Sequence, residues 1–185
     1  MFETAEAALT SNQQRTTNNH QPTYRLRQAA WPVGQLFQLL ASAPATGQYL
    51  YVFSVDAQHV VHFHWPRQAG LNEKFDGLNE SALLVAGSTQ IAIPGPAKAL
   101  KLAQPGTDRL VLLFSKKKID TVQQLAALVA RKEGDFGQNL RQLLGKFAVP
   151  TEDIRYFPDR IGFEASSRSG GFIVPLVLEV ECAGE

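Results

Sequence analysis

Two of the four histidines stand two residues apart in the stretch VHFHW. If this stretch is a β-strand, His62 and His64 leave the same face, because successive strand side chains alternate. Zinc and copper accept imidazole pairs with this geometry, and His59 lies just upstream. A structural zinc site would still need thiolate or carboxylate partners. The alternative interpretation is a pair of polar residues on a half-exposed strand that binds no metal, and we expect no cofactor. The apolar side of that strand would carry Val61, Phe63 and Trp65.

Signals for nucleophilic catalysis are absent from the sequence. There is no G-x-S-x-G motif, and the only cysteine, Cys182, has no histidine nearby in the chain. Several carboxylates stand in expected turns, where aspartate is favoured because its side chain bonds its own backbone. These are Asp56, Asp108, Glu152, Asp153 and Asp159. A spatial pair among them stays open, but the sequence identifies no catalytic residue and favours a protein that is not an enzyme.

A long connection follows the histidine strand, from Arg67 to Ala86. Connections longer than about 12 to 15 residues are uncommon in compact domains and are often functional or mobile. The sequence does not identify a ligand, but this segment supplies the candidate binding residues. They are Asn72, Asp76 and Asn79.

The histidines belong to a stretch that reads as the central hairpin of the fold, Gln48 to Pro66. On its first strand, Tyr49, Tyr51, Phe53 and Val55 share one face, while Leu50, Val52 and Ser54 share the other. Both faces are mostly apolar, which is typical of a strand that is covered on two sides. Asp56 is expected to form an Asx turn, and Pro66 ends the second strand. The aromatic residues here are expected to be core, with a glycan- or peptide-binding platform at the sheet edge as the alternative.

The rest of the chain predicts an α+β fold. We expect an antiparallel β-sandwich-like domain of about eight strands over residues 24–185, with a helical hairpin inserted at about 120–148. Asp120 with Gln123, and Asp135 with Gln138, have the spacing of capping boxes. Pro175 lies within the last long strand, which favours an edge position or a bulge there. Residues with helical spacing form one apolar stripe: Phe136, Leu140, Leu143, Leu144 and Phe147.

The first 23 residues are predicted to form a polar flexible arm or linker. Residues 10–23 are rich in Asn, Gln and Thr and offer little apolar surface to offset the entropy of ordering. A short helix is expected from Glu3 to Leu9. No signal peptide is visible, so either the protein is cytoplasmic or a targeting segment has been removed.

Composition excludes some classes of partner. The 185 residues carry 18 basic and 17 acidic side chains, a net charge of +1, which argues against nucleic-acid binding through a broad basic face. The cluster Lys116–Lys118 is interpreted as a solvated connection between a strand and a helix. No run approaches the roughly 18 apolar residues of a membrane span, so we expect no direct membrane insertion. Oligomeric state cannot be predicted from the sequence.

Several short motifs, in this order, resemble the bacterial domain of unknown function 4384. They are Tyr49–Val52, Asp56, Trp65–Pro66, Gly87, Ile93–Pro94, Pro105–Asp108 and Phe114–Ser115. The resemblance covers about residues 24–120. Here Trp65 replaces the usual aromatic residue before proline, and Ala57–His59 replaces a turn that commonly has glycine. The resemblance implies an accessory β-domain with no established activity, attached to peptidase-like, kinase-like or envelope proteins, and it implies no site residues.

The expected function is therefore a non-catalytic binding or assembly module of a bacterial envelope-associated or multidomain protein. Its partner would be another protein or an upstream domain of the same polypeptide. The resemblance favours the periplasm or cell envelope. Two alternatives stay open: a hydrolase with catalytic residues on loops, and a subunit whose sheet edge pairs with a partner strand. A deep pocket with converging titratable groups would favour the enzyme, and an exposed apolar patch or unpaired strand edge a binding module.

Overall fold

The computed structural model describes residues 2–8, 13–16, 23–26, 30–42, 47–72, 77–84, 90–157, 161–166 and 170–184. They form an α+β fold, as predicted. The first strands are β1 (Phe2–Ala8), β2 (Gln13–Thr16), β3 (Thr23–Leu26), β4 (Trp31–Pro32), β5 (Leu36–Phe37), β6 (Leu39–Ser42), β7 (Gln48–Val55) and β8 (Val61–Trp65). They are followed by β9 (Leu83–Leu84), β10 (Ile91–Ile93), β11 (Leu100–Lys101), β12 (Gly106–Ser115), β13 (Ile154–Tyr156), β14 (Ile161–Ala165) and β15 (Ile173–Ala183). The helices are α1 (Val122–Ala130) and α2 (Phe136–Leu144), with 3₁₀ turns at Gly145–Phe147 and Thr151–Asp153.

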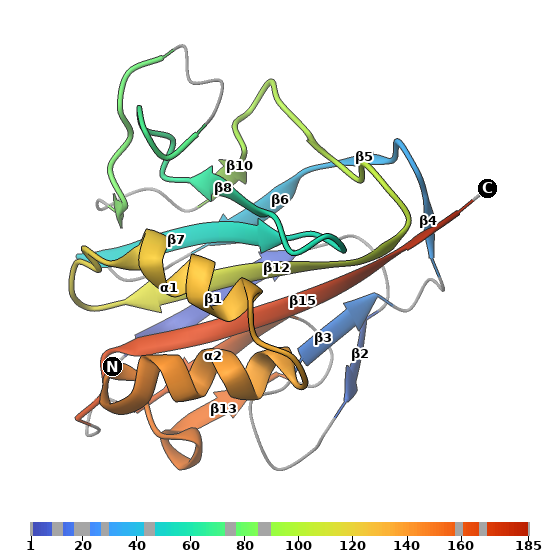
Figure 1. The fold of residues 1–185 in the computed structure, drawn as a ribbon. Helices are drawn as coiled ribbons and strands as arrows, with labels where there is room; N and C mark the ends of the chain where they lie inside the picture. Colours follow the sequence, from blue (N-terminus) through green and yellow to red (C-terminus); the bar gives the residue numbers. More distant parts are fainter. Residues whose placement is uncertain are drawn as a thin grey trace.

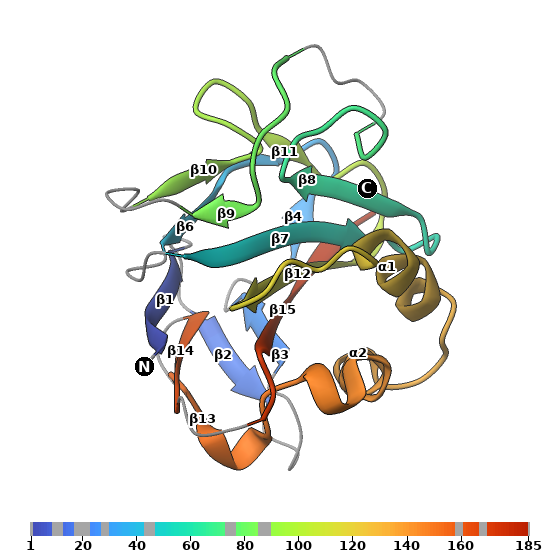
Figure 2. The ribbon, with the colours of Figure 1, turned by 90° about the vertical axis from the view of Figure 1, so that its left-hand side faces the viewer.

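The elements form three layers, which Figures 1 and 2 show from two sides. A sheet ordered β2-β3-β15-β12-β7-β8 lies in the middle, with α1 and α2 on one face. A second sheet, ordered β10-β6-β1-β14-β13, covers the other face, and β11 pairs with β5 in a small third sheet. The described strands outnumber the expected eight, because elements of two or three residues are too short to show a period in sequence.

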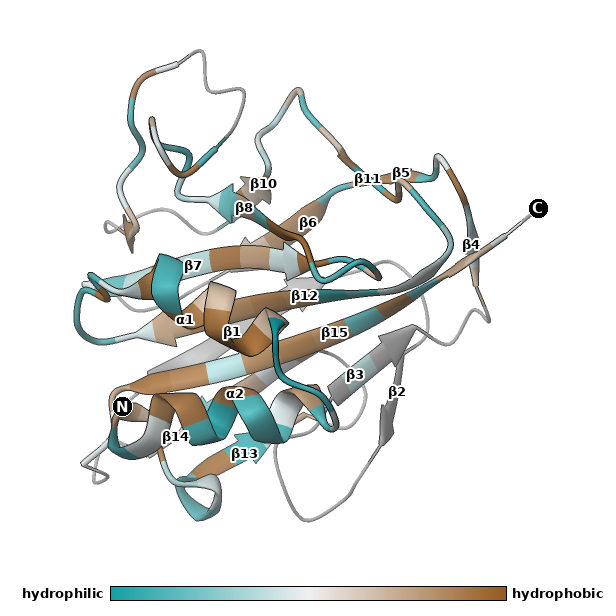
Figure 3. Cartoon of the chain, in the orientation of Figure 1, coloured by the Kyte–Doolittle hydropathy of each residue, from teal (hydrophilic) through white to brown (hydrophobic). Residues whose placement is uncertain are grey.

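Strand β7 is covered on both sides, as its pattern predicts. Tyr51, Phe53 and Val55 pack in the cluster beneath the helices. Leu50 and Val52 pack in the cluster between the two sheets. The neighbouring strand β12 divides its side chains in the same way, and Figure 3 shows the apolar bands of both strands.

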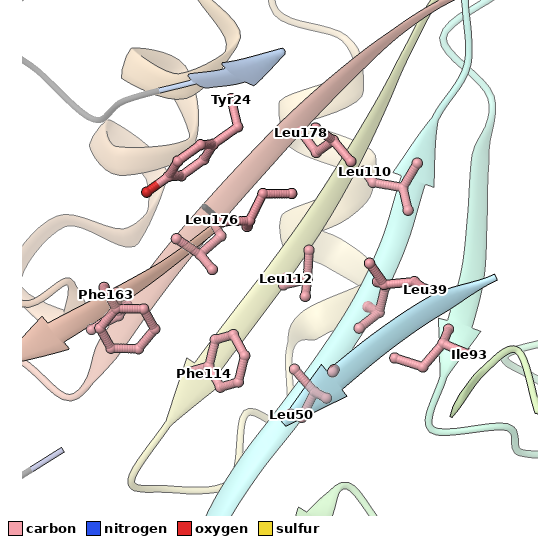
Figure 4. Close-up of a cluster of buried hydrophobic side chains, with 14 of the residues drawn as sticks. Tyr24, Leu39, Leu50, Ile93, Leu110, Leu112, Phe114, Phe163, Leu176 and Leu178 are labelled. Carbon is pink, nitrogen blue, oxygen red and sulfur yellow. The ribbon is translucent and has the colours of Figure 1, made fainter. Parts of the chain in front are cut away.

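The core between the sheets is filled by large apolar side chains from both layers (Figure 4). Phe114 of β12 meets Phe163 of β14 edge-on, with ring centroids 5.4 Å apart. The buried Tyr24 donates from its hydroxyl to the carbonyls of Phe157 and Gly162, at 3.2 and 3.0 Å. The ring of Tyr24 therefore fills core space while its polar end is satisfied.

A β-bulge interrupts the pairing of β8 with β7. Phe63 lies opposite Phe53, but the next pair is Trp65 with Val52, which leaves His64 as the extra residue. The bulge changes the faces of the strand. Phe63 packs with the helix-side cluster, whereas Trp65 packs with the inter-sheet cluster. The prediction that Val61, Phe63 and Trp65 share one face is wrong for Trp65, because one inserted residue reverses the alternation beyond it.

The amino-terminal segment contributes strands to both sheets. Strand β1 pairs with β14 and β6, so the helix expected from Glu3 to Leu9 is wrong. Strand β2, inside the expected polar arm, pairs with β3. Backbone groups can pair in a ladder without apolar side chains, so composition alone does not exclude strands here. The other residues of the expected arm, apart from Thr23 in β3, lie outside the described residues.

The helical hairpin is present, and its two helices differ in how their amino-terminal ends are capped. Asp135 caps α2 by accepting a 2.7 Å hydrogen bond from the backbone N–H of Gln138, as predicted. Asp120 does not cap α1, which begins after Thr121 without a side-chain cap. Asp120 instead pairs with Lys118 at 2.6 Å, because a charged neighbour competes for its carboxylate. Of the predicted stripe, Phe136, Leu140 and Leu144 are buried, Leu143 is half-buried and Phe147 is exposed.

Pro175 occupies a local edge within β15. It faces Leu113 of β12, but its carbonyl points away from β12 and accepts from the Tyr156 hydroxyl at 3.4 Å. The N and C=O of one strand residue point to the same side, so the missing N–H also faces away from the ladder. Strand β3 joins β15 only from Val177. The predicted edge position therefore holds locally, in a strand that is otherwise central.

None of the helices within the described ranges is long and apolar enough to span a membrane.

Candidate ligand-binding site at the polar end of the core

The core between the two sheets becomes polar at the end of β7 and the start of β12. The face of β7 that carries Leu50 and Val52 continues with Ser54 and Asp56. Strand β12 carries Asp108 at this level, and β8 carries His62 and His64. These side chains line a cavity of about 310 Å³, which we call the histidine pocket.

The opposite wall of the histidine pocket is mainly apolar. It comes from β5, β11 and the chain around them. Gln38 holds this wall in place by donating from its amide to the carbonyls of Gly95 and Lys98, at 2.6 and 3.1 Å. The apolar lining residues are Phe37, Pro94, Ala99, Leu100, Leu102 and Leu110.

Asp56 organises the turn and fixes one histidine. Its Oδ1 accepts from the backbone N–H of Gln58 at 2.9 Å and of Val60 at 2.8 Å, the expected Asx turn. Its Oδ2 accepts from His62 Nε2 at 3.0 Å. Burial raises the pKa of Asp56, but the hydrogen bonds from His62, Val60 and Gln58 outweigh it and leave that pKa below its usual value. Asp56 is therefore an ionised, fully engaged carboxylate at neutral pH.

His64 is placed by the bulge and bonds to Ser54. The distance between His64 Nε2 and Ser54 Oγ is 2.8 Å, and Ser54 is buried. Burial, with a smaller contribution from His62, lowers the pKa of His64 to about 4. His64 is therefore neutral at pH 7. Bulges commonly re-aim a side chain beside a functional site, and this one directs an imidazole into the cavity.

Asp108 differs from Asp56 in having an unmet oxygen. Its Oδ1 is sealed from solvent and has no hydrogen-bond partner. Burial and the nearby Asp56 carboxylate raise the pKa of Asp108, and a hydrogen bond from the Ala57 backbone and the charge of His62 counteract this only in part. A buried acceptor without a donor is uncommon and calls for an explanation.

The structure does not bring the histidine pair together as a metal site. His62 bonds to Asp56 and His64 to Ser54, each in a separate pair. Within the described part of the chain, no three His, Cys, Asp or Glu side chains are grouped so as to hold a metal ion. The third histidine, His59, points elsewhere: its Nδ1 lies 2.8 Å from the carbonyl of Ala130 at the end of α1. Cys182 is a buried core residue.

Two candidates from the long connection have structural contacts. Asn72 accepts from the Gln68 backbone N–H at 2.8 Å and donates to the carbonyl of Phe63 at 2.6 Å. Asn79 accepts from the Ala69 backbone N–H at 2.9 Å. The third candidate, Asp76, lies outside the described residues. Asn72 and Asn79 therefore hold the shape of the loop, which the Arg67–Glu80 ion pair also braces.

A second cavity, of about 680 Å³, lies between this loop and the start of α1. Tyr51 lines this cavity, and the Tyr51 hydroxyl accepts from the Ile119 backbone N–H at 2.9 Å. Gln123 of α1 donates to the carbonyl of Gly70 at 3.2 Å. The cavity is larger than the histidine pocket, but its polar groups are mainly used to join loop and helix.

The sequence did not identify Ser54 or Asp108 as members of a common site. Ser54 could have been found, because a tight hairpin places it opposite His62, as observed. Asp108 had no local signal beyond its turn, since it reaches the pocket only through the pairing of β12 with β7.

No protein-family model, curated protein or solved structure matches this chain. The resemblance to the domain of unknown function 4384 therefore stays a prediction.

Proposed function

We propose that this chain is a non-catalytic binding module and that the histidine pocket receives its ligand. The observation that carries the proposal is the cavity itself, which joins an apolar wall to a small set of fixed polar groups. Ligand sites commonly have this composition and a volume of about 300 Å³ or more. In line with the resemblance, the module would serve a bacterial envelope-associated or multidomain protein.

The polar groups in the pocket are held in advance of any ligand. Two backbone N–H groups and His62 fix Asp56, and His64 is held by Ser54. Side chains that are already ordered lose little entropy when a ligand arrives, and this favours binding. Such preorganisation supports a recognition role for the pocket.

The hydrolase is the alternative, and the Ser54–His64 hydrogen bond is the observation in its favour. A hydrolytic triad needs one histidine that contacts both a serine and a carboxylate. Here those contacts belong to two histidines, because Asp56 bonds to His62 and Ser54 bonds to His64. With a pKa of about 4, His64 is also a weak acceptor for a serine proton. Both features favour binding over catalysis.

Reaction with a fluorophosphonate separates the two functions, because the reagent labels only activated serines. We expect no labelling of Ser54 in the wild-type protein under conditions that label a known serine hydrolase. Labelling that disappears in both Ser54→Ala and His64→Gln would establish the hydrolase instead.

Binding is tested by titrating the isotope-labelled protein with n-butanol, n-butylamine and butyrate while NMR follows its backbone amide signals. We expect at least one of these probes to shift signals from Ser54, His62 and Asp108. Signals from Gly70 and Gln123, at the larger cavity, serve as the internal control. If none of the three probes shifts the pocket signals at concentrations up to tens of millimolar, the pocket is not a ligand site for short aliphatic molecules and the proposal fails.

Pairing of a sheet edge with a partner strand is a further proposal. Strand β8 ends the order of the large sheet, and no described strand pairs with its outer edge. A partner strand there would protect the outward-facing amides of β8 from hydrogen exchange. Its addition would leave the pocket signals unchanged, which distinguishes the two modes of binding.

A further inference from the structure

Asp108 Oδ1 is the starting point for naming the ligand. This oxygen is sealed from solvent and has no donor, although the pocket contains several polar side chains. Leaving a buried polar atom unpaired destabilises the folded protein, because the atom has lost its hydrogen bonds to water. The group that Asp108 lacks is therefore a hydrogen-bond donor, and a ligand in the pocket supplies it once the Asp108 side chain turns its oxygen toward the pocket, because Oδ1 is closed to solvent.

The charges around the oxygen specify the donor further. Asp56 and Asp108 both face the histidine pocket, and the charge of Asp56 disfavours a second negative charge on Asp108. His62 forms a hydrogen bond with the Asp56 carboxylate, and His64 is neutral at pH 7. A cation beside Asp108 would relieve the repulsion and donate the missing hydrogen bond at the same time.

The one lysine that lines the pocket does not fill this role. Lys101 of β11 is exposed, and its stem lies against Gly34, with Cε about 4.0 Å from where a Gly34 Cβ would be. It forms no ion pair with Asp56 or Asp108. Lys101 therefore does not neutralise Asp108, whose carboxylate lines the pocket.

The remaining wall specifies what the cation is attached to. The pocket is also lined by side chains that offer only hydrocarbon surface, contributed by β5, by β11 and the chain just after it, and by β12. An aliphatic stem of a few carbons would lie against them, and each methylene that it buries favours binding. The residues in question are Phe37, Leu100, Leu102 and Leu110.

We propose that the histidine pocket binds a protonated primary amine on an aliphatic stem, with Asp108 as the residue that accepts its hydrogen bond. This assignment rests on the proposed binding function and gives its ligand a chemical class. A lysine side chain of a partner protein and a free alkyl amine share this chemistry.

The test compares three probes of four carbons each that have unbranched alkyl stems and different heads: n-butylamine, n-butanol and butyrate. At pH 7.5 we expect n-butylamine to shift the NMR signals of the pocket with saturation. We expect n-butanol and butyrate to bind at least tenfold more weakly. Binding of n-butanol or butyrate as tightly as the amine would overturn the amine assignment while leaving the binding function intact. If none of the three probes shifts the pocket signals, both the amine assignment and the proposed binding function are overturned.

Variants then locate the amine. Asp108→Asn should weaken the affinity for n-butylamine at least tenfold. Glu152→Gln removes a negative charge from an exposed position and should change that affinity less than twofold. Ala99→Trp narrows the pocket without touching a carboxylate and should also weaken binding. Unchanged affinity in a folded Asp108→Asn protein contradicts the assignment. If that variant does not fold, unchanged affinity in Ala99→Trp contradicts it.

Two further amines separate the sources of the ligand. Lysine amide acetylated on its α-nitrogen imitates a lysine side chain on a protein, and cadaverine is a free diamine. Stronger binding of the lysine model supports a partner protein, and stronger binding of cadaverine supports a small-molecule ligand. Failure of both to displace n-butylamine would overturn the proposal that the amine site serves either source.

Discussion

The two histidines of the pocket differ in nearly every property except their residue type. His62 is 44% exposed and donates to the Asp56 carboxylate, which also holds the turn. His64, two residues further on, bonds to the Ser54 hydroxyl and has a pKa of about 4. A regular strand would give both residues similar surroundings. The bulge at His64 removes that equivalence by turning one ring toward the core.

This difference explains why the pocket contains serine, histidine and aspartate without assembling a triad. Each histidine uses its Nε2 atom for one partner, so the carboxylate and the hydroxyl are never joined through one ring. The exposed Asp56–His62 pair keeps a charged turn in place, and the half-buried Ser54–His64 pair fixes a neutral polar surface. The pocket is therefore built for recognition by static groups, and Asp108 is the group whose hydrogen bonding is incomplete.

The largest expected effect is a pH-dependent loss of stability from His64. Its pKa is about 4 in the folded protein and about 6.5 when unfolded, so above pH 6.5 neither state is protonated and there is no effect. As the pH falls from 6.5 to 4, only the unfolded state gains the proton, and folding loses about 3 kcal/mol. Urea denaturation at a series of pH values between 7.5 and 4 measures this loss.

The control for this prediction uses the neighbouring histidine. His64→Gln keeps a polar partner for Ser54 but cannot titrate. The free energy of unfolding of this variant should therefore depend much less on pH between 6.5 and 4. His62→Gln changes the exposed ring and leaves His64 in place, so the steep dependence should persist. If the wild type and His64→Gln show parallel profiles, His64 is not held neutral by burial.

Gly106→Ala is expected to have the next largest effect. Gly106 has φ +124°, and an added Cβ would lie 2.4 Å from the Cβ of Ala57 in the turn. Backbone strain of this kind costs about 1 to 3 kcal/mol, and the clash displaces the turn that carries Asp56. The free energy of unfolding should therefore fall by about 2 kcal/mol. NMR signals of His62 should shift more than those of His64.

Ala57→Gly provides the matched control for this clash. The double variant removes the opposing Cβ and leaves only the strain of the positive φ. It should therefore be more stable than Gly106→Ala alone. Equal stability of the single and double variants would show that steric contact with the turn is not the cause.

Much of the fold was predictable because its main elements carry strong local patterns. The two-sided apolar pattern of β7, the Asp56 turn and the helical stripe from Phe136 to Leu144 each encode their structure within a few residues. The bulge was not predictable in this way. No residue type in VHFHW marks the insertion, and the position of Trp65 follows from packing against the second sheet.

The site was less predictable than the fold, because it joins segments that are distant in sequence. The histidine pair and Asp56 were visible as polar residues in one hairpin. Asp108 and the apolar wall from β5 and β11 enter through sheet pairing and loop packing, which no local pattern contains. The sequence places the candidate binding residues in the long connection, yet Asn72 and Asn79 bond to the backbone of that connection.

Asp108→Asn is expected to stabilise the protein modestly at neutral pH. The pKa of Asp108 is raised in the folded state, so folding is favoured while the carboxyl is protonated and loses stability as the pH rises through that pKa. An amide avoids this loss, and the free energy of unfolding at pH 7 should rise by about 1 kcal/mol. Urea denaturation of this variant beside Glu152→Gln gives the comparison. A destabilised Asp108→Asn would show that the hydrogen bond from Ala57 and the nearby His62 outweigh the cost of burying the carboxylate.

Asp56 should give the smallest effect when only its charge is removed, and this result separates its two roles. Asp56→Asn keeps an oxygen for the N–H groups of Gln58 and Val60 and loses only the attraction to His62. Because His62 is 44% exposed, solvent screens that attraction, and the loss should be about 0.5 kcal/mol. Asp56→Ala removes the turn bonds as well and should cost about 1 kcal/mol more. If both variants lose the same free energy in urea denaturation, the hydrogen bond to His62 and not the Asx turn holds the hairpin, and the exposed histidine contributes more than its surroundings imply.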